Sequence, residues 1–200
     1  MHSQVTGFVL AGGKSSRMGS NKALLALDGK LMIEHKKSIL DSVCGKVFIL
    51  GQRNLYGSFG QCYEDVYPDC GPLGGIHAAL LNSPTEWSLV TAVDTPFITA
   101  EFLDYLMERA VNSSAQVTTP SVGGHVQPLC TVFHRSFLPV AEAALKAGNY
   151  KVKAAFPKDR TLILREDELA QFALAVEMFE NLNTPEDLER ARERSTGRPR

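Results

Sequence analysis

The sequence lacks an excess of basic residues and any long apolar run. Its 21 lysine and arginine residues stand against 22 acidic ones, a formal net charge of −1, whereas a nucleic-acid-binding surface normally shows as a positive excess. No apolar stretch approaches the roughly 20 residues that span a bilayer. Met1–Gln4 leads directly into an apolar segment, without the pattern of a signal peptide. We therefore expect neither nucleic acid nor a membrane as a partner.

Cysteine and histidine patterns typical of metal sites are also missing. The four cysteines, Cys44, Cys62, Cys70 and Cys130, are widely spaced and form no Cys-x-x-Cys pair, and the five histidines form no cluster. This favours reduced thiols in a cytoplasmic protein over disulfides or a cysteine-bound metal. No serine lies in a nucleophile-elbow motif, so the sequence gives no sign of a serine hydrolase.

Strand and helix signals alternate along the first half of the chain, which predicts βαβ units and a mainly parallel sheet with helices on both faces. We expect strands at 6–10, 46–50, 62–65 and 88–93, and helices at 31–43, 74–81 and 99–111. The second half predicts strands at 115–120, 126–133 and 161–164, and helices at 137–147, 151–156 and 184–194. Two hundred residues suit one domain. We therefore predict one three-layer α/β/α domain over 1–194, with 195–200 as a flexible tail.

The segment Leu10–Lys22 has the composition of a phosphate-binding loop. It reads Leu-Ala-Gly-Gly-Lys-Ser-Ser-Arg-Met-Gly-Ser-Asn-Lys directly after a predicted strand. Glycine permits close approach of the backbone to a ligand, and backbone N–H groups in such a loop can point at phosphate oxygens. Arg17 and Lys22 add charge-assisted donors. A glycine-rich surface turn without a ligand would explain the glycines but not the spacing of the cations, so we favour a nucleoside triphosphate loop.

Two common phosphate loops are excluded by single positions in this segment. A Walker A motif ending at Lys14-Ser15 requires glycine at position 8, where the chain has Phe8. The dinucleotide fingerprint Gly-x-Gly-x-x-Gly is absent because Gly12 and Gly13 are adjacent.

Two aspartates follow other predicted strands. Asp94 opens an Asp-Thr-Pro turn after the strand at 88–93, and ligands of parallel sheets bind beyond the carboxyl ends of the strands. A carboxylate at that edge can hold Mg²⁺ together with substrate phosphates; a turn that merely ends the strand is the alternative. Asp65 precedes Gly71-Pro72-Leu73-Gly74-Gly75, a tight turn into a helix whose start can face an anion or a ribose. A solvated carboxylate is the alternative there.

These segments together resemble the molybdenum cofactor guanylyltransferases, which are nucleotidyltransferases with a glycosyltransferase-A-like α/β fold. The similar motifs are Leu-Ala-Gly-Gly-x-Ser-x-Arg-Met-Gly-x-x-Lys, Gly-Pro-Leu-Gly-Gly-Ile and Asp-Thr-Pro. The resemblance implies that Asp94 binds magnesium and nucleotide, and that Asp65 contacts the nucleotide. It implies catalytic roles for Lys22 and Arg17 on the triphosphate. The remaining nucleotide-binding candidates are Leu10, Ala11, Gly12 and Gly13.

Two later segments resemble the acceptor side of the same family. Gln127-Pro128-Leu129 is similar to its proline-leucine strand, and Asn181–Leu188 to its Asn-x-Asn-Thr-Pro-Glu-Asp-Leu motif. Gln127, Pro128, Asn181 and Asn183 are therefore acceptor candidates. A simple hairpin at 123–127, and asparagines that only shape a strand-to-helix turn, are the alternatives. The resemblance divides the domain into a nucleotide-binding half, about 6–112, and an acceptor-binding half, about 113–194.

The resemblance implies transfer of GMP from GTP to the molybdenum-molybdopterin cofactor, with Mg²⁺ as cofactor and release of pyrophosphate. Other proteins of molybdenum cofactor biosynthesis, or acceptor proteins, are implied as partners. The alternatives are a cytidylyltransferase on the same pterin, another NTP-dependent nucleotidyltransferase, and an inactive nucleotide-binding regulator.

The chain departs from the family pattern at three places. Asn21 stands where the family usually has aspartate. The site therefore lacks one negative charge, and an inactive nucleotide-binding regulator remains an alternative function. The segment 51–54 lacks a match to the family's base-contacting asparagine. Gly74 replaces an alanine, and we expect little effect because both residues are small.

Overall fold

The computed structural model describes residues 2–12, 21–172 and 176–196. Within these ranges an eight-stranded sheet forms the centre, and β9 runs antiparallel to its neighbours while the other pairings along the sheet order are parallel. The order is β10 (Thr161–Leu164), β7 (Val117–Val122), β9 (Cys130–His134), β6 (Trp87–Ala92), β1 (His2–Leu10), β4 (Cys44–Leu50) and β5 (Cys62–Tyr63), with β8 (His125–Val126) paired to β7.

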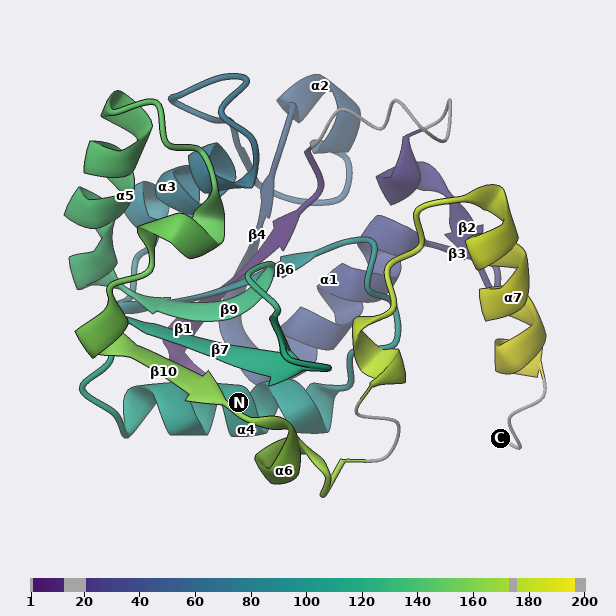
Figure 1. Cartoon of the computed structure of the whole chain (residues 1–200). Helices are drawn as coiled ribbons and strands as arrows, with labels where there is room; N and C mark the ends of the chain where they lie inside the picture. Colours follow the sequence, from purple (N-terminus) through teal and green to yellow (C-terminus); the bar gives the residue numbers. More distant parts are fainter. Residues whose placement is uncertain (1, 13–20, 173–175, 197–200) are drawn as a thin grey trace.

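Helices cover both faces of the sheet because the side chains of its strands alternate in direction. Val9 of β1 packs in one cluster with α1 (Met32–Val43) and α4 (Ala100–Val111). Phe8 packs on the opposite face with α3 (Pro72–Asn82) and α5 (Leu138–Lys146). Figure 1 shows these two helix layers with the sheet between them. The predicted three-layer, mainly parallel α/β fold is confirmed.

The predicted strand at 126–133 is interrupted. β7 and β8 form a hairpin that turns at Gly123 and Gly124, whose φ angles are 58° and 74°, as a two-residue hairpin turn requires. The chain then leaves the ladder at 127–129 before β9 begins. A hairpin is therefore present in the 123–127 segment.

The remaining elements are several short helices and strands and the C-terminal helix. They are η1 (Lys22–Leu24), β2 (Ala26–Leu27), β3 (Lys30–Leu31), α2 (Arg53–Tyr56), η2 (Arg135–Phe137), η3 (Val152–Ala155), η4 (Lys158–Arg160), α6 (Glu166–Leu169), η5 (Glu177–Phe179) and α7 (Pro185–Thr196). No helix in the described ranges combines the length and the apolar character that crossing a bilayer requires.

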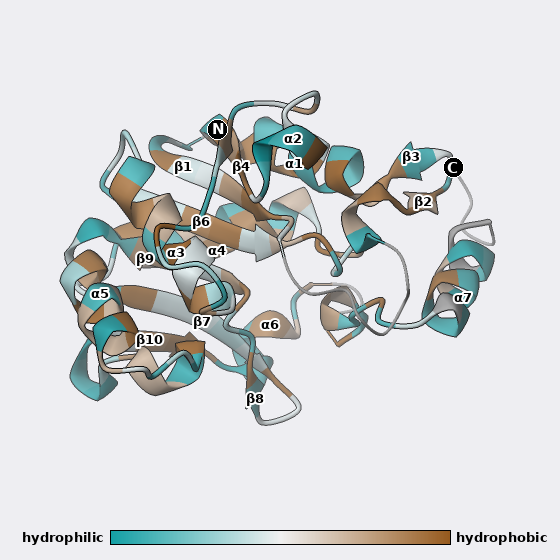
Figure 2. Ribbon diagram, turned by 90° about the horizontal axis from the view of Figure 1, so that it is seen from above, coloured by the Kyte–Doolittle hydropathy of each residue, from teal (hydrophilic) through white to brown (hydrophobic). Residues whose placement is uncertain are grey.

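The last helix returns to the first half of the chain. Thr184 caps α7, as predicted: its Oγ1 accepts from the Asp187 N–H at 3.1 Å. Leu188 of α7 packs in a small cluster with Leu27 of β2 and Met32 of α1, and Figures 1 and 2 show α7 beside β2 and β3 at one end of the molecule. The helix continues through Thr196, beyond its predicted end, and the rest of the predicted tail, 197–200, lies outside the described residues.

Candidate active site

The carboxyl ends of three parallel strands meet at one edge of the sheet. Leu10 at the end of β1 pairs with Leu50 of β4 on one side and Ala92 of β6 on the other. The N–H groups of Ala11 and Gly12 donate to Leu50 O at 3.0 and 3.1 Å. The segment after β1 and the turn after β6 therefore lie on the same edge, as the predicted sheet required.

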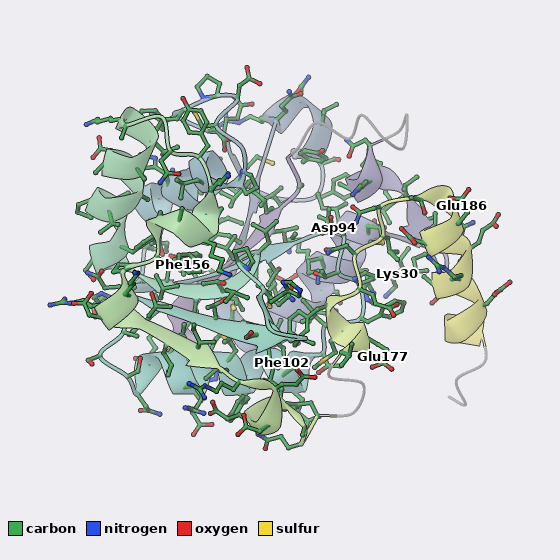
Figure 3. The ribbon with its side chains drawn as sticks, in the orientation of Figure 1. Lys30, Asp94, Phe102, Phe156, Glu177 and Glu186 are labelled. Carbon is green, nitrogen blue, oxygen red and sulfur yellow. The ribbon has the colours of Figure 1, made fainter. Side chains whose placement is uncertain are left out.

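Three residues from separate motifs meet at this edge. Lys22 Nζ lies 3.5 Å from Asp94 Oδ2 and donates to Asn183 Oδ1 at 2.5 Å. The side chains of Lys22 and Asp94 are only 19% and 21% exposed, so their attraction is less screened than that of a surface pair. Figure 3 places Asp94 between the end of β6 and the segment that leads into α7. The structure thus joins three sequence-predicted site residues in one group.

The second carboxylate oxygen of Asp94 lies in a different environment from the first. Oδ1 is buried and has no hydrogen-bond partner among the described residues, and leaving a buried acceptor unsatisfied is unfavourable. The described residues contain no group of three or more histidine, cysteine or acidic side chains arranged to hold a metal. A buried carboxylate oxygen without a partner is of the chemical type that divalent cations accept as a ligand.

The turn that carries Asp94 is held through its backbone carbonyls. Asp94 O accepts from the Leu182 N–H at 2.8 Å. Thr95 O accepts from Lys36 Nζ at 2.5 Å, and Pro96 O from His35 Nε2 at 3.0 Å. Burial lowers the pKa of Lys36 to about 8, and burial also lowers the pKa of His35, against the opposing effect of its bond to Pro96. Three successive carbonyls thus have donors from distant segments.

Sequence reasoning missed Lys36, although a signal was present. Lys36 lies three residues after Ile33 and four before Leu40, both fully buried, and this spacing places it on the buried stripe of α1. A lysine on the apolar face of an amphipathic helix was the signal that something polar lies beneath that helix.

A second hydrogen-bonded group links the two ends of the predicted phosphate loop. Asn21 Nδ2 donates to Tyr56 Oη at 2.8 Å, and Tyr56 Oη donates to Ala11 O at 3.0 Å. Asn21 Oδ1 accepts from the Ala23 N–H at 3.1 Å. An ionised aspartate cannot donate to the tyrosine hydroxyl, so asparagine completes this chain of bonds. Gly13 and Arg17, both predicted site residues, lie outside the described residues.

Asp65 lies against the start of α3. A Cβ atom added to Gly74 would stand 3.1 Å from Asp65 Oδ2, and one added to Gly75 would stand 3.6 Å from Asp65 Oδ1 and 2.6 Å from Leu10 Cδ1. Asp65 thus lies against both glycines, and Leu10 lies against Gly75. Partial burial of the carboxyl raises the pKa of Asp65.

The expectation that Gly74 differs little from alanine is wrong. A Cβ at Gly74 would stand 2.9 Å from Tyr67 O, too close for a backbone atom to be accommodated without a shift. The glycine is therefore required by the path of the 65–67 segment.

The acceptor candidates lie in two places. Gln127 and Pro128 belong to the loop between β8 and β9, and Leu129 O of that loop accepts from the Ala92 N–H at 2.9 Å, which brings the loop beside the end of β6. Gln127 Nε2 donates to His125 O within the same loop, at 3.2 Å. Asn181 lines a cavity of about 170 Å³ whose other walls include Phe97 and Arg190.

An α/β sheet with Lys22 and Asp94 at its carboxyl edge is an arrangement expected of a nucleotide-binding transferase. The model of the family described as MobA-like NTP transferase domain matches residues 7–161. The chain belongs to this family and is a transferase.

Named relatives align with nearly the whole chain. The chain is 37% identical to a "Probable molybdenum cofactor guanylyltransferase" of Pelotomaculum thermopropionicum, over 94% of this chain and 92% of the relative. It is 33% identical to a "Molybdenum cofactor guanylyltransferase" of Vibrio parahaemolyticus, over 92% and 93%.

Solved structures share the fold. Molybdopterin-guanine dinucleotide biosynthesis protein A of Archaeoglobus fulgidus superposes with a TM-score of 0.84 at 24% identity, covering 96% of this chain and all of that one. A putative protein of Aquifex aeolicus superposes with a TM-score of 0.71 at 26% identity, over 90% and 93%.

Proposed function

We propose that this protein transfers GMP from GTP to the molybdenum-molybdopterin cofactor, forming molybdopterin guanine dinucleotide and releasing pyrophosphate. The observation that carries the proposal is the convergence of Lys22, Asp94 and Asn183 at the carboxyl edge of the sheet. The names of the relatives support guanine and the molybdenum cofactor as the reacting partners.

Transfer by such a site depends on positioning and on neutralising charge. The acceptor phosphate would attack the α-phosphorus of GTP in line with the departing pyrophosphate. Lys22, and in this proposal Arg17, would stabilise charge on the triphosphate, because an ammonium or guanidinium is a strong donor to phosphate oxygens. No covalent enzyme intermediate is needed.

Transferases of this family typically act with a divalent metal ion, and we propose Mg²⁺ held by Asp94. The unpartnered Asp94 Oδ1 fits this role. When bound, the ion would neutralise charge that develops on phosphate oxygens. The ion pair with Lys22 holds the other carboxylate oxygen in place.

The nucleotide would lie along Leu10, Ala11, Gly12 and Gly13, with Asp65 on its sugar side. The N–H groups of Ala11 and Gly12 already donate to Leu50 O, so we assign these two residues close packing against the nucleotide rather than phosphate N–H donation. Gly12 is exposed at this edge, which supports such a contact.

The acceptor would approach from the side of Asn181, Asn183, Gln127 and Pro128. Asn183 is central to this arrangement because its Oδ1 accepts from Lys22, the residue that also faces the triphosphate. In this proposal residues of both sequence halves, 6–112 and 113–194, complete one site within a single domain. We also propose that the protein acts in the cytoplasm. Its protein partners in this proposal are other proteins of molybdenum cofactor biosynthesis.

The test is release of pyrophosphate with each of the four nucleoside triphosphates, Mg²⁺ and the molybdenum-loaded pterin. We expect kcat/KM for GTP to exceed that for CTP and ATP by at least about 10², because a site that bonds one base edge leaves buried polar groups unpaired with another. A preference for CTP would indicate a cytidylyltransferase on the same pterin. Absence of turnover with every triphosphate would favour an inactive regulator. Against that alternative, Asn21 bonds to Tyr56 and Ala23 and not to Asp94, so the missing aspartate at position 21 does not alter the contacts of Asp94.

A further inference from the structure

A single lysine lies fully buried beneath the turn that carries Asp94. Lys36 is 0% exposed, and its Nζ donates to Thr95 O at 2.5 Å and to Thr95 Oγ1 at 3.3 Å. The next residue along α1, Lys37, differs completely in its surroundings, because it pairs with Asp41 on the exposed side of the same helix at 2.7 Å. The two lysines therefore offer a matched comparison.

An ammonium group is strongly disfavoured in a protein core unless hydrogen bonds and an opposite charge compensate for the lost water. Thr95 supplies two acceptors, and the negative charge of Asp94 favours the charged form of Lys36. An apolar side chain at position 36 would pack without a desolvation penalty but would leave Thr95 O without this donor. Lys36 is thus the donor that satisfies Thr95 O beneath the turn.

Asp94 needs such support because it lies beyond the end of β6, where the ladder no longer fixes the backbone. β6 ends at Ala92. The orientation of the Asp94 carboxylate also matters, because its two oxygens differ. Oδ2 faces Lys22, whereas Oδ1 has no partner among the described residues. A small rotation of the turn would exchange or misdirect the two oxygens.

We propose that Lys36 is a positioning residue of this site: its hydrogen bonds to Thr95 hold the turn so that Asp94 presents Oδ1 to the divalent metal of the reaction. This inference rests on the proposed function. Lys36 touches neither metal nor substrate in this arrangement, since it acts from beneath the turn through Thr95.

The test compares the full-length wild type with Lys36→Met, Lys36→Gln and the control Lys37→Met. Misplacement of a reacting group by a fraction of an ångström to one ångström lowers rates by about 10-fold to 100-fold. We therefore expect Lys36→Met to lower kcat by at least about 10-fold while KM for GTP changes by less than about 3-fold, because Lys36 does not contact the Leu10–Gly12 segment. Lys36→Gln, which keeps a donor, should recover part of the loss, and Lys37→Met should behave as wild type.

Two readouts are independent of turnover. The Kd of Mn²⁺, measured by electron paramagnetic resonance with GTP present, should rise at least about 5-fold in Lys36→Met, about 1 kcal/mol. Amide hydrogen exchange should accelerate in the segment 93–98 but not in β1 or β4. The proposal would be overturned if Lys36→Met had the same kcat, the same Mn²⁺ affinity and the same amide exchange as the wild type. The proposal would also be overturned if kcat fell equally in Lys36→Met and Lys36→Gln while amide exchange accelerated throughout the sheet.

The outcomes separate this inference from the proposed function. A wild-type protein that binds Mn²⁺ with GTP but makes no dinucleotide overturns the function, while the Mn²⁺ and exchange results still decide the role of Lys36. If Lys36→Met does not fold, Lys36→Gln decides. Weaker Mn²⁺ binding by at least about 2-fold with unchanged GTP affinity supports the proposal, and wild-type values contradict it.

Discussion

At the scale of single residues, the two carboxylate oxygens of Asp94 have different surroundings. One carboxylate oxygen faces Lys22 and the other is buried without a partner among the described residues. The turn around it is fixed by backbone carbonyls that accept from Leu182, Lys36 and His35. Since none of these bonds uses the carboxyl of Asp94, its chemistry can be changed without dismantling the turn.

We therefore expect Asp94→Asn to fold as wild type and to lower kcat by at least about 10², the scale of losing one strong electrostatic group in an active site. Circular dichroism and pyrophosphate release at saturating Mg²⁺ would measure the two effects. The control is Asp41→Asn, which removes a surface carboxylate paired with Lys37. Near wild-type turnover of folded Asp94→Asn would show that the metal assignment is wrong.

Tyr56 provides a second test at this scale. Tyr56→Phe removes the hydroxyl that joins Asn21 to Ala11 O, and an unsatisfied buried carbonyl lowers stability by about 1–3 kcal/mol. We expect a lower free energy of unfolding in urea and a rise of about 5-fold in KM for GTP, about 1 kcal/mol.

The control for this variant is Tyr63→Phe, whose hydroxyl accepts only from the exposed Gln61 among the bonds of the described residues. Equal effects of the two tyrosine substitutions on KM would contradict a specific role for the Tyr56 bonds.

At the scale of elements, the register of β1 with β4 and β6 decides which loops become neighbours. The strands and helices predicted for the first half of the chain were confirmed, because apolar periodicity reports burial directly. The short β2–β3 pair and helix α2 were not predicted. The interruption between β8 and β9 was missed, although Pro128, which cannot donate a hydrogen bond to a strand ladder, was the signal for it. The start of α3 was predicted as a tight turn, but its closeness to Tyr67 and Asp65 was not.

Gly74→Ala tests that closeness. In an open helix, replacing glycine by alanine stabilises by about 1 kcal/mol. Here we expect the opposite sign, a loss of about 1–3 kcal/mol typical of overpacking, because the new Cβ meets Tyr67 O at 2.9 Å. Gly75→Ala should cost less, since its obstacle is the terminal methyl of Leu10. Urea unfolding of both variants would measure the order, and a stabilised Gly74→Ala would contradict the argument.

At the scale of the whole molecule, buried titratable groups should make the free energy of unfolding vary with pH above about pH 8. Burial raises the pKa of Cys44 and Cys130 from 9.0 to about 12 and lowers that of Lys36 from 10.5 to about 8. Between pH 8 and 9 the unfolded chain therefore binds more protons than the folded one, through Lys36. Above pH 9 the folded chain keeps two thiol protons that the unfolded chain loses.

Stability should thus rise from pH 8 to 9 and fall above it, by about 1.4 kcal/mol per pH unit for each net proton. Urea unfolding with a reductant at pH 7.5, 9 and 10 would measure both limbs. Lys36→Met should remove the rise, and the double variant Cys44→Ala with Cys130→Ala should remove the fall. A wild-type stability that decreases steadily from pH 8 would contradict the assignment to Lys36.

The sequence by itself determined the fold class and the edge at which the site lies. Glycines, cations and carboxylates that follow parallel strands must meet at one edge, so Leu10, Lys22 and Asp94 could be grouped before any contact was known. Tertiary structure alone decided the contacts that hold this group. Lys22 meets Asn183 across 161 positions, Lys36 meets Thr95 across 59 and Tyr56 meets Ala11 across 45. The physical reason is that periodicity shows which residues are buried, whereas the hydrogen-bond partner of a buried polar group depends on how distant elements pack.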